Sequence, residues 1–269
     1  MGQTSAIGTI NTFRLDGKVS VVTGASRGIG LAMAEGLAGA GSDLVIVGRK
    51  INTLTPIAER VASETGQQVL PVQADVGELA QIERVVEQAM GRFGQIDVLV
   101  NNAGLNVRRP AEEYAPADWD MVTGVNLKGA FFMAQACGKV MIQQKNGKII
   151  NTLSLTSAVG LPTTVAYTAA KGGLMQITKL LAVEWAVHNI QVNGIAPGFI
   201  STELTAPVRA DENRNTWILN RTPAGRWGEP EDLAGLTVFF ASDASNFVTG
   251  QMVFVDGGFM AGSDWRTRS

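Results

Sequence analysis

Short apolar runs alternate with segments of helical periodicity along almost the whole chain. The apolar runs predict buried β-strands at residues 19–22, 44–47, 69–73, 96–100, 148–152, 190–195 and 252–255. The periodic segments predict helices at residues 31–38, 51–65, 79–92, 117–144 and 165–187. Continuous apolar strands separated by helices are typical of a parallel sheet that is covered on both faces. We therefore expect an α/β fold, a single-domain Rossmann-like doubly wound sheet whose ligand crevice lies at the carboxyl ends of the strands.

The domain organisation follows from the two least regular stretches of the chain. Residues 1–13 mix Gly, Thr, Ser and Asn and lack a basic region followed by an apolar one, so we expect a flexible N-terminal tail and no signal peptide. Residues 14–269 are expected to form a single catalytic domain. Within it, residues 199–226 are expected to be an irregular substrate loop that closes over a bound ligand. A disordered or oligomer-contacting loop is the alternative.

Composition narrows the possible functions. The 269 residues are 45% hydrophobic and 17% charged, with a formal net charge of -2, which is ordinary for a globular protein and offers no basic surface for nucleic acid. No apolar run approaches the roughly 20 residues of a membrane-spanning helix. The single cysteine, Cys137, excludes an internal disulfide and a cysteine metal cluster, and it is expected to be a core thiol. We expect no metal, and a cytoplasmic location is the default for such a chain.

A glycine-rich turn joins the first predicted strand to the first predicted helix. Residues 23–30 read TGASRGIG, with the spacing G-x-x-x-G-x-G. Missing Cβ atoms let the backbone approach a diphosphate, and a helix N-terminus supplies N–H donors. The turn therefore predicts a dinucleotide site that includes Gly24, Ser26, Arg27, Gly28, Ile29 and Gly30.

The end of the second predicted strand indicates which dinucleotide binds. NAD-selective sheets place an acidic residue near this position, whereas here Gly48 is followed by Arg49, and Arg27 lies in the glycine turn. Guanidinium groups bind a ribose 2′-phosphate through charge-assisted hydrogen bonds. We therefore predict that NADP(H) is preferred and that NAD(H) is possible. The alternative is that Arg49 is a solvated residue paired with an acid such as Glu78.

Two further strand ends carry candidate cofactor contacts. Asp75 and Val76 follow the third strand, where Asp75 either binds the adenine amino group or caps the next helix. Asn102, Ala103 and Gly104 follow the fourth strand, where small residues let the chain pass against the cofactor. A simple turn is the alternative for this second stretch.

The candidate chemistry lies after the fifth predicted strand. Ser154 follows that strand, and Tyr167 and Lys171 are four residues apart on one face of the next predicted helix. A nearby cation lowers the pKa of a tyrosine, which is about 10 in water. We expect Tyr167 to exchange a proton with a substrate carbonyl or alcohol, Lys171 to lower its pKa, and Ser154 to bind the substrate oxygen. Taken one at a time, the same residues are also explained by packing, a solvated charge and a strand cap.

Together these motifs resemble the short-chain dehydrogenase/reductase family, over about residues 15–259. The matching elements are Thr23-Gly24-x-x-x-Gly28-Ile29-Gly30, Asp75, Asn101-Asn102-Ala103-Gly104, Asn126, Ser154, Tyr167-x-x-x-Lys171, Pro197-Gly198 and Thr202. The resemblance implies a catalytic tetrad of Asn126, Ser154, Tyr167 and Lys171. In that scheme Asn126 holds a water that relays protons to Lys171.

The same resemblance implies contacts at the nicotinamide end of the cofactor. Lys171 would bind the nicotinamide ribose. The family pattern also assigns this end to the residues after the sixth strand, namely Pro197, Gly198, Ile200 and Thr202. A homotetramer is implied by the family as well.

Within the family, three stretches look like gluconate 5-dehydrogenase and 2-deoxy-gluconate 3-dehydrogenase, at residues 106–110, 188–193 and 221–228. The first contains Arg108 and Arg109. These paired arginines lie one residue further from the preceding glycine than the pair expected in that subgroup. A guanidinium near the crevice is suited to bind a sugar-acid carboxylate, and a subunit-interface or solvated role is the alternative. We therefore expect an oxidoreductase that interconverts a ketone and a secondary alcohol on a small polar substrate such as a keto-sugar or sugar acid. A β-ketoacyl carrier-protein reductase and a non-catalytic cofactor-sensing protein are the alternative functions.

Overall fold

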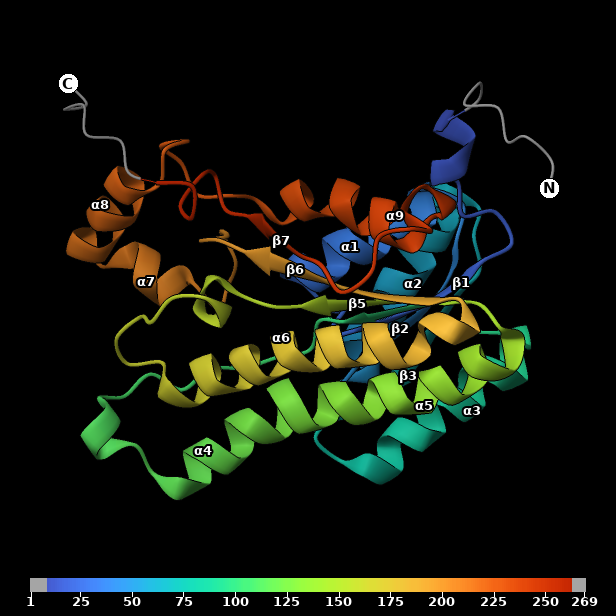
Figure 1. Cartoon of the computed structure of the whole chain (residues 1–269), viewed down its shortest axis with the longest axis horizontal. Helices are drawn as coiled ribbons and strands as arrows, with labels where there is room; N and C mark the ends of the chain where they lie inside the picture. The colour runs from blue at the N-terminus through green and yellow to red at the C-terminus, as the bar shows by residue number, and fades with distance from the viewer. Residues whose placement is uncertain (1–8, 263–269) are drawn as a thin grey trace.

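A seven-stranded parallel sheet forms the centre of the molecule (Figure 1). The computed structural model describes residues 9–262. The strands are β1 (Val19–Thr23), β2 (Asp43–Gly48), β3 (Val69–Gln73), β4 (Val98–Asn101), β5 (Gly147–Thr152), β6 (Ile190–Pro197) and β7 (Met252–Val255). Their order in the sheet is β3-β2-β1-β4-β5-β6-β7, so the direction of winding reverses between β1 and β4. In such sheets the ligand crevice lies outside the carboxyl ends of the strands at this reversal. The predicted doubly wound fold is confirmed.

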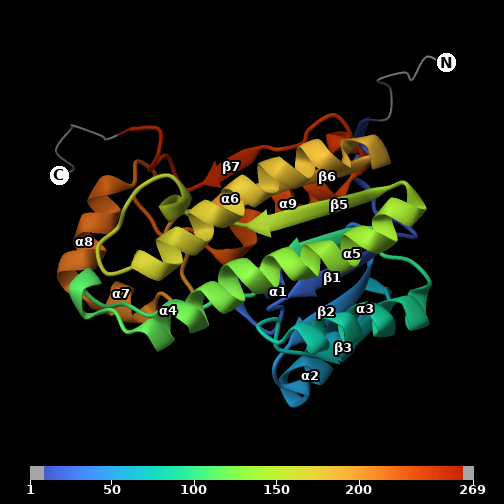
Figure 2. The same ribbon diagram turned by 60° about the horizontal axis from the view of Figure 1, so that its bottom comes forward.

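Helices cover both faces of the sheet (Figures 1 and 2). One face packs against α1 (Gly28–Gly39), α2 (Ile51–Thr65) and α9 (Ala234–Ala241), and the other against α3 (Leu79–Phe93), α5 (Ala130–Gln144) and α6 (Val165–Trp185). Successive strand residues point to opposite faces, because the side-chain period of a strand is two. Val22 and Ile46 therefore belong to the first core, whereas Val21 and Val45 belong to the second. This two-sided burial explains why the strands are continuously apolar in the sequence.

The predicted helix at residues 117–144 is not continuous. It consists of α4 (Pro116–Thr123), a π-helical turn (Gly124–Gly129) and α5. The turn widens around Asn126, whose Nδ2 donates to Val122 O and Leu105 O, both at 2.8 Å. π-helical turns occur frequently at functional sites. Periodicity did not locate this turn, because one of its stabilising contacts, with Leu105 O, comes from another segment.

Two strand and helix ends also differ from the prediction. β4 begins at Val98 rather than at Ile96, because the side chain of Gln144 takes both backbone groups of Ile96, accepting from its N at 3.1 Å and donating to its O at 2.9 Å. α6 ends at Trp185, and the chain continues as a 3-10 turn (Ala186–His188) instead of an α-helix to residue 187.

Two stretches expected to be irregular contain helices. Residues 199–226 include α7 (Ala206–Ala210) and α8 (Glu212–Arg221), so only part of the predicted substrate loop is irregular. At the other end, a 3-10 helix (Thr9–Phe13) occupies part of the predicted tail, and the ring of Phe13 lies 6.1 Å from that of Phe239. The rest of that tail, residues 1–8, and the final residues 263–269 of the predicted domain lie outside the described residues.

Two predicted absences concern membranes and metals. Among the helices of residues 9–262, none combines the length and apolar character that a bilayer crossing requires. The same part of the chain holds no cluster of three His, Cys, Asp or Glu side chains arranged to bind a metal. Cys137 is buried, as predicted for a core thiol, and burial raises its pKa to about 12.

Candidate active site

Tyr167 and Lys171 lie on one face of α6, as the four-residue spacing predicted. The Lys171 ammonium is over the Tyr167 ring, 5.6 Å from its centroid. Its Nζ donates to Thr152 O at 2.7 Å, which ties the helix to the end of β5. Only 3% of Lys171 is exposed. Burial lowers the pKa of Lys171 to about 8, so this side chain changes its charge near neutral pH.

Ser154 is brought to Tyr167 by a tight turn after β5. Its extended backbone begins the 3-10 turn Leu155–Ser157, and its Oγ accepts from Thr156 N at 3.1 Å. Ser157 closes the turn, because its Oγ accepts from Ser154 N at 3.3 Å and donates to Lys171 O at 3.1 Å. The turn is thus bonded directly to the helix that carries the tyrosine. A side-chain hydrogen bond with Ser154 lowers the pKa of Tyr167.

The electrostatics of Tyr167 differ from the prediction. The pKa of Tyr167 is raised, and burial is the largest cause. Ser154 and then Arg108 act in the opposite direction, whereas Lys171 is not among the groups that lower this pKa. Lys171 donates to a backbone carbonyl and lies over the ring face. The role of Lys171 in lowering this pKa therefore stays a prediction, and Arg108 is the cation among the described groups that lowers it.

Asn126 presents a buried acceptor. Its Oδ1 is buried and has no hydrogen-bond partner in residues 9–262, while its Nδ2 is held by the two carbonyls described above. A Cβ on Gly104 would lie 2.6 Å from this oxygen, so the glycine leaves room for it. A buried acceptor of this kind requires a donor such as an ordered water. The residue thus fits the relay role that the family resemblance implied.

The glycine turn has the conformation that a diphosphate site needs. Gly24 and Gly28 have φ values of 68° and 54°, which favour glycine. A Cβ on Gly30 would lie 2.3 Å from Asn102 Nδ2 and from Gly24 O. No described side chain caps the N-terminus of α1 at Arg27, which leaves its first N–H groups without a side-chain acceptor, as an anion site requires. Ser26 and Ile29 lie in the same turn, and Ile29 packs on the adjoining core.

The loop after β4 is bonded to the glycine turn. Thr23 Oγ1 accepts from the backbone N of Asn102 and of Ala103, at 3.0 and 3.1 Å. In return, Asn102 Nδ2 donates to Thr23 O at 3.1 Å and to Gly24 O at 3.3 Å. Two motifs that are far apart in the sequence therefore form one surface at the point where the sheet order reverses. The simple-turn alternative does not account for these bonds.

Asp75 caps a turn rather than a helix. Its Oδ1 accepts from Gly77 N at 2.9 Å, and α3 begins only at Leu79 after Glu78. The helix-cap alternative is therefore wrong in detail. Val76 is buried, and a Cβ on Gly129 would lie 2.4 Å from its carbonyl oxygen. This contact packs the strand end against the π-helical turn.

The segment after β6 reaches the glycine turn. Gly198 N donates to Val255 O at 2.9 Å, and a Cβ on Gly198 would lie 2.7 Å from Asp256 Cα. The Thr202 methyl would lie 3.4 Å from a Cβ on Gly28, so Thr202 faces the expected cofactor site. Ile200 is 3% exposed and belongs to the core, which leaves only its backbone for a cofactor. Pro197 is the last residue of β6.

The four candidate arginines have different surroundings. Arg27 Nη1 is 2.5 Å from Glu203 Oε2, and both side chains are largely exposed. Arg49 is exposed and has no ion pair with Glu78 or any other described acid, so the pairing that the alternative interpretation expected is absent from the described residues. Arg109 Nε is 2.8 Å from Asp118 Oδ2 on α4.

Arg108 has no hydrogen bond or ion pair with any residue from 9 to 262. Its pKa is lowered, first by burial and second by the charge of Arg214. Arg214 is a residue that the sequence reasoning missed, because it lies far along the chain inside a segment with no motif. The two neighbouring arginines of the sequence thus separate, and Arg108 alone acts on Tyr167.

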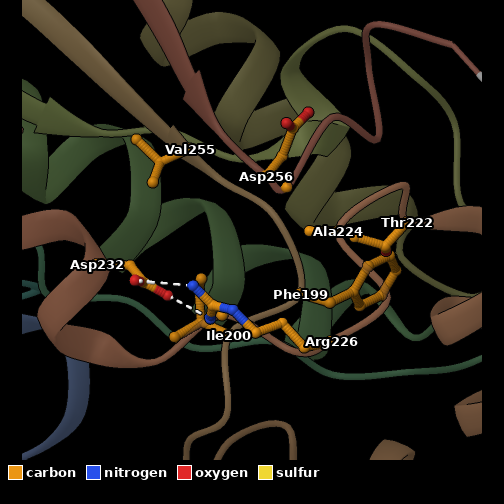
Figure 3. A pocket seen from close by; sticks show the side chains of 10 residues that line it. Phe199, Ile200, Thr222, Ala224, Arg226, Asp232, Val255 and Asp256 are labelled. Carbon is orange, nitrogen blue, oxygen red and sulfur yellow. Dashed lines mark hydrogen bonds and ion pairs between the residues drawn. The ribbon is translucent and has the colours of Figure 1, made fainter.

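A cavity of about 190 Å³ lies beside this site rather than in it. Figure 3 shows the Arg226 guanidinium pointing to the Asp232 carboxylate, with contacts of 2.7 and 3.1 Å. The lining residues are Phe199, Ile200, Thr222, Ala224, Arg226, Gly228, Asp232, Val255, Asp256 and Gly257. None of the four tetrad residues is among them. The cavity is therefore lined by the segment after β6 and by later residues of the chain, and the candidate catalytic residues do not line it.

Known proteins resemble the chain over nearly its whole length. The family model described as Enoyl-(Acyl carrier protein) reductase matches residues 24–260. A 2-dehydro-3-deoxy-D-gluconate 5-dehydrogenase from Escherichia coli (strain K12) is 49% identical over 253 residues, covering 94% of this chain and 99% of the relative. A gluconate 5-dehydrogenase from Gluconobacter oxydans (strain 621H) is 42% identical over 252 residues, covering 91% and 96%. Among solved structures, a gluconate 5-dehydrogenase from Burkholderia cenocepacia J2315 in complex with NADP and tartrate has a TM-score of 0.91 and 42% identity, covering 94% and 99%.

Proposed function

The chain belongs to the short-chain dehydrogenase/reductase family, and on that premise we propose that it is an NADP(H)-dependent oxidoreductase that interconverts a secondary alcohol and a ketone on a sugar acid. The observation that carries the proposal is that the turn that begins at Ser154 is bonded to α6, where Lys171 lies over the Tyr167 ring. Arg108 has no acid partner in the described chain and lowers the pKa of Tyr167. A proton-transfer group beside an unpaired guanidinium suits a substrate that has both a reactive oxygen and a carboxylate.

The roles follow from the geometry. In reduction, the Tyr167 phenol donates a proton to the carbonyl oxygen, and in oxidation its phenolate accepts the proton of the alcohol. Ser154 holds that same oxygen by a hydrogen bond, which stabilises the charge that develops on it. Lys171 and Asn126 pass the proton onward, since the Asn126 Oδ1 acceptor is buried and ready for a donor. The nicotinamide cofactor supplies or accepts the hydride when it is bound.

Several residues fit NADP(H). Gly24, Gly28 and Gly30 leave the backbone of the turn open, and the uncapped start of α1 suits the diphosphate. Arg49 is exposed and has no acid partner among the described residues, so it is available for a ribose 2′-phosphate. Arg27 exchanges its exposed contact with Glu203 for the phosphate. The relative crystallised with NADP supports the same preference.

The names of the relatives support the substrate class. Both sequence relatives are named as 5-dehydrogenases, one of gluconate and one of 2-dehydro-3-deoxy-D-gluconate, and both substrates are carboxylic acids. The family model's description points instead to carrier-protein substrates. The net charge of -2 offers no general basic surface for an acidic carrier, which favours the small acid.

A substrate panel tests the proposal. Purified protein is assayed with NADP⁺ and with NAD⁺ against D-gluconate, 2-dehydro-3-deoxy-D-gluconate and the neutral polyol D-sorbitol, and with NADPH against 5-keto-D-gluconate and a β-ketoacyl carrier-protein thioester. We expect turnover of at least one acid, with kcat/KM about tenfold or more above that for D-sorbitol. Turnover of the thioester alone would assign the protein to the carrier-protein reductases. Cofactor binding without any turnover would assign it a sensing role.

A further inference from the structure

Three buried polar side chains form a chain of hydrogen bonds across β4, β5 and α6. Asn101 on β4 and Asn151 on β5 are paired in the sheet register, and Asn101 Nδ2 donates to Asn151 Oδ1 at 3.0 Å. Asn151 Nδ2 donates in turn to Thr178 Oγ1 on α6 at 2.9 Å. All three residues are at most 4% exposed. Because a buried polar group costs free energy unless it is hydrogen-bonded, loss of any one of these bonds leaves its partner in an unfavourable state.

Thr178 is held in one conformation at its end of this chain. Its Oγ1 donates to Leu174 O, one helical turn earlier, at 2.8 Å, and accepts from Asn151. A β-branched side chain has few χ1 rotamers, and the bond to Leu174 selects one of them. The hydroxyl therefore has a fixed position along the axis of α6.

The bond between Asn151 and Thr178 is one of two side-chain hydrogen bonds that join α6 to β5 within the described residues. The other runs from Lys171 Nζ to Thr152 O at 2.7 Å. Lysine has a flexible four-carbon stem, so its bond survives a small shift of the helix along the strand, whereas the short threonine cannot follow such a shift. The bond from Ser157 Oγ to Lys171 O lies in the turn after β5, outside the sheet. Apolar contacts are non-directional, so Thr178 is the side chain that fixes α6 along β5.

The position of α6 along β5 decides where the Tyr167 phenol lies. Ser154 follows β5, whereas Tyr167 is carried by α6, so their side-chain hydrogen bond depends on how the helix lies on the strand. A displacement of about 1 Å between reacting groups costs roughly 100-fold in rate. The same chain of bonds reaches the π-helical turn, because Asn101 Nδ2 also donates to Ala130 O, in the residue after that turn, at 2.9 Å.

We propose that Asn151 and Thr178 are positioning residues of the reaction, because their bond holds α6 on β5 at the place where Tyr167 meets Ser154. This inference rests on the proposed function, in which Tyr167 transfers the proton and Ser154 binds the substrate oxygen. It deepens that function by naming two residues outside the tetrad on which the rate depends. Both act through Tyr167, and neither has a direct role in the chemistry.

The test removes the Thr178 hydroxyl and then restores it. Thr178→Val keeps the branched shape without the hydroxyl, and Thr178→Ser returns the hydroxyl. Thr237→Val on α9 is the matched control, because Thr237 is also fully buried and its Oγ1 donates to Leu233 O at 2.9 Å, yet it accepts no side-chain bond in the described chain. The measurements are the urea midpoint, the Kd for NADPH, and kcat and KM with the sugar acid that the wild type turns over fastest.

Thr178→Val is expected to lower kcat about 10- to 100-fold while KM and the Kd for NADPH stay within about threefold. Thr178→Ser should keep kcat within about threefold of the wild type and Thr237→Val within about twofold. Both valine variants should lower the urea midpoint, since each loses a buried hydrogen bond. Equal kcat values for Thr178→Val and Thr237→Val would overturn the proposal, and so would a serine variant as slow as the valine variant.

Asn151→Ala removes the same bond from the strand side and provides the comparison if Thr178→Val does not fold. It should lower kcat at least as far as Thr178→Val. The double variant should be no slower than Asn151→Ala alone, because the two residues act through one bond. A wild-type kcat in Asn151→Ala, or additive losses in the double variant, would contradict the proposal.

A second readout does not require turnover. The chain has two tyrosines, Tyr114 and Tyr167, so labelling with fluorotyrosine gives two fluorine NMR signals, and Tyr167→Phe identifies the signal of Tyr167. That signal should move in Thr178→Val and return in Thr178→Ser, and an unmoved signal would overturn the proposal. Absence of wild-type turnover with every acid would instead overturn the proposed function, and the fluorine signal would still test the position of Tyr167.

Discussion

Gly104→Ala tests whether Asn126 is held ready for a proton relay. An added Cβ would lie 2.6 Å from Asn126 Oδ1, whereas ordinary contacts begin at 3.4 Å, so one group must move by about 0.8 Å. Asn126 resists this movement through its bonds to Leu105 O and Val122 O. Loss of one bond costs about 1 kcal/mol and overpacking about 1–3 kcal/mol, so the free energy of unfolding should fall by about 1–3 kcal/mol. A displacement of about 1 Å near the chemistry costs roughly 100-fold in rate, so kcat should fall by about that factor.

The matched control for this variant is Gly91→Ala. Gly91 lies on α3, is exposed, and an added Cβ would meet nothing within 4 Å. This substitution should raise the free energy of unfolding by about 0.5–1 kcal/mol through helix propensity and leave kcat unchanged. The assay combines urea unfolding, NADPH binding by fluorescence and kcat with the preferred sugar acid. If Gly104→Ala binds NADPH normally and keeps kcat within twofold of the wild type, Asn126 has no relay role and the reasoning is refuted.

Four further outcomes test individual residues. Tyr167→Phe should reduce kcat about 100-fold or more and leave NADPH binding intact, which separates proton transfer from cofactor affinity; normal turnover would exclude Tyr167 as the acid. Because the Arg108 charge lowers the pKa of Tyr167, Arg108→Gln should raise it, so the pH at which oxidation with D-sorbitol reaches half its maximum should move upward; an unmoved profile contradicts this. Arg49→Ala should reduce the NADPH-to-NADH ratio of kcat/KM by about 10- to 100-fold. An unchanged ratio would show that Arg49 does not bind the ribose 2′-phosphate. Val183, 77% exposed on α6, should line a contact between subunits, so sedimentation should give a tetramer for the wild type and smaller species for Val183→Glu.

The sheet could be predicted from the sequence because the residue pattern that indicates a strand lies within that strand and the segment after it. Strands such as β1, β2 and β4 are apolar on both faces, and each of the first five strands is followed by a segment of helical period. Residues such as Val21 and Val22 therefore indicate burial on both faces without any knowledge of their partners. The π-helical turn at Asn126 could not be predicted in this way. It is stabilised by Leu105 O, a group from a different loop, and nothing in the neighbouring sequence signals that contact.

The charges of the site depend on distances that no spacing rule supplies. The i,i+4 rule placed Lys171 next to Tyr167 correctly, yet proximity on a helix says nothing about which atom the ammonium approaches, and it approaches the ring face and Thr152 O. Arg108 and Arg109 are adjacent in sequence, yet only Arg109 has an ion-pair partner, because Asp118 on α4 binds Arg109 and not Arg108. Residue type therefore predicts that a cation is present near the crevice, whereas the packing of α4 decides which of the two arginines remains unpaired and so is available to a carboxylate. In this protein α4, an element outside the catalytic motif, makes that selection, because its Asp118 binds Arg109 and leaves Arg108 without an acid partner in the described chain.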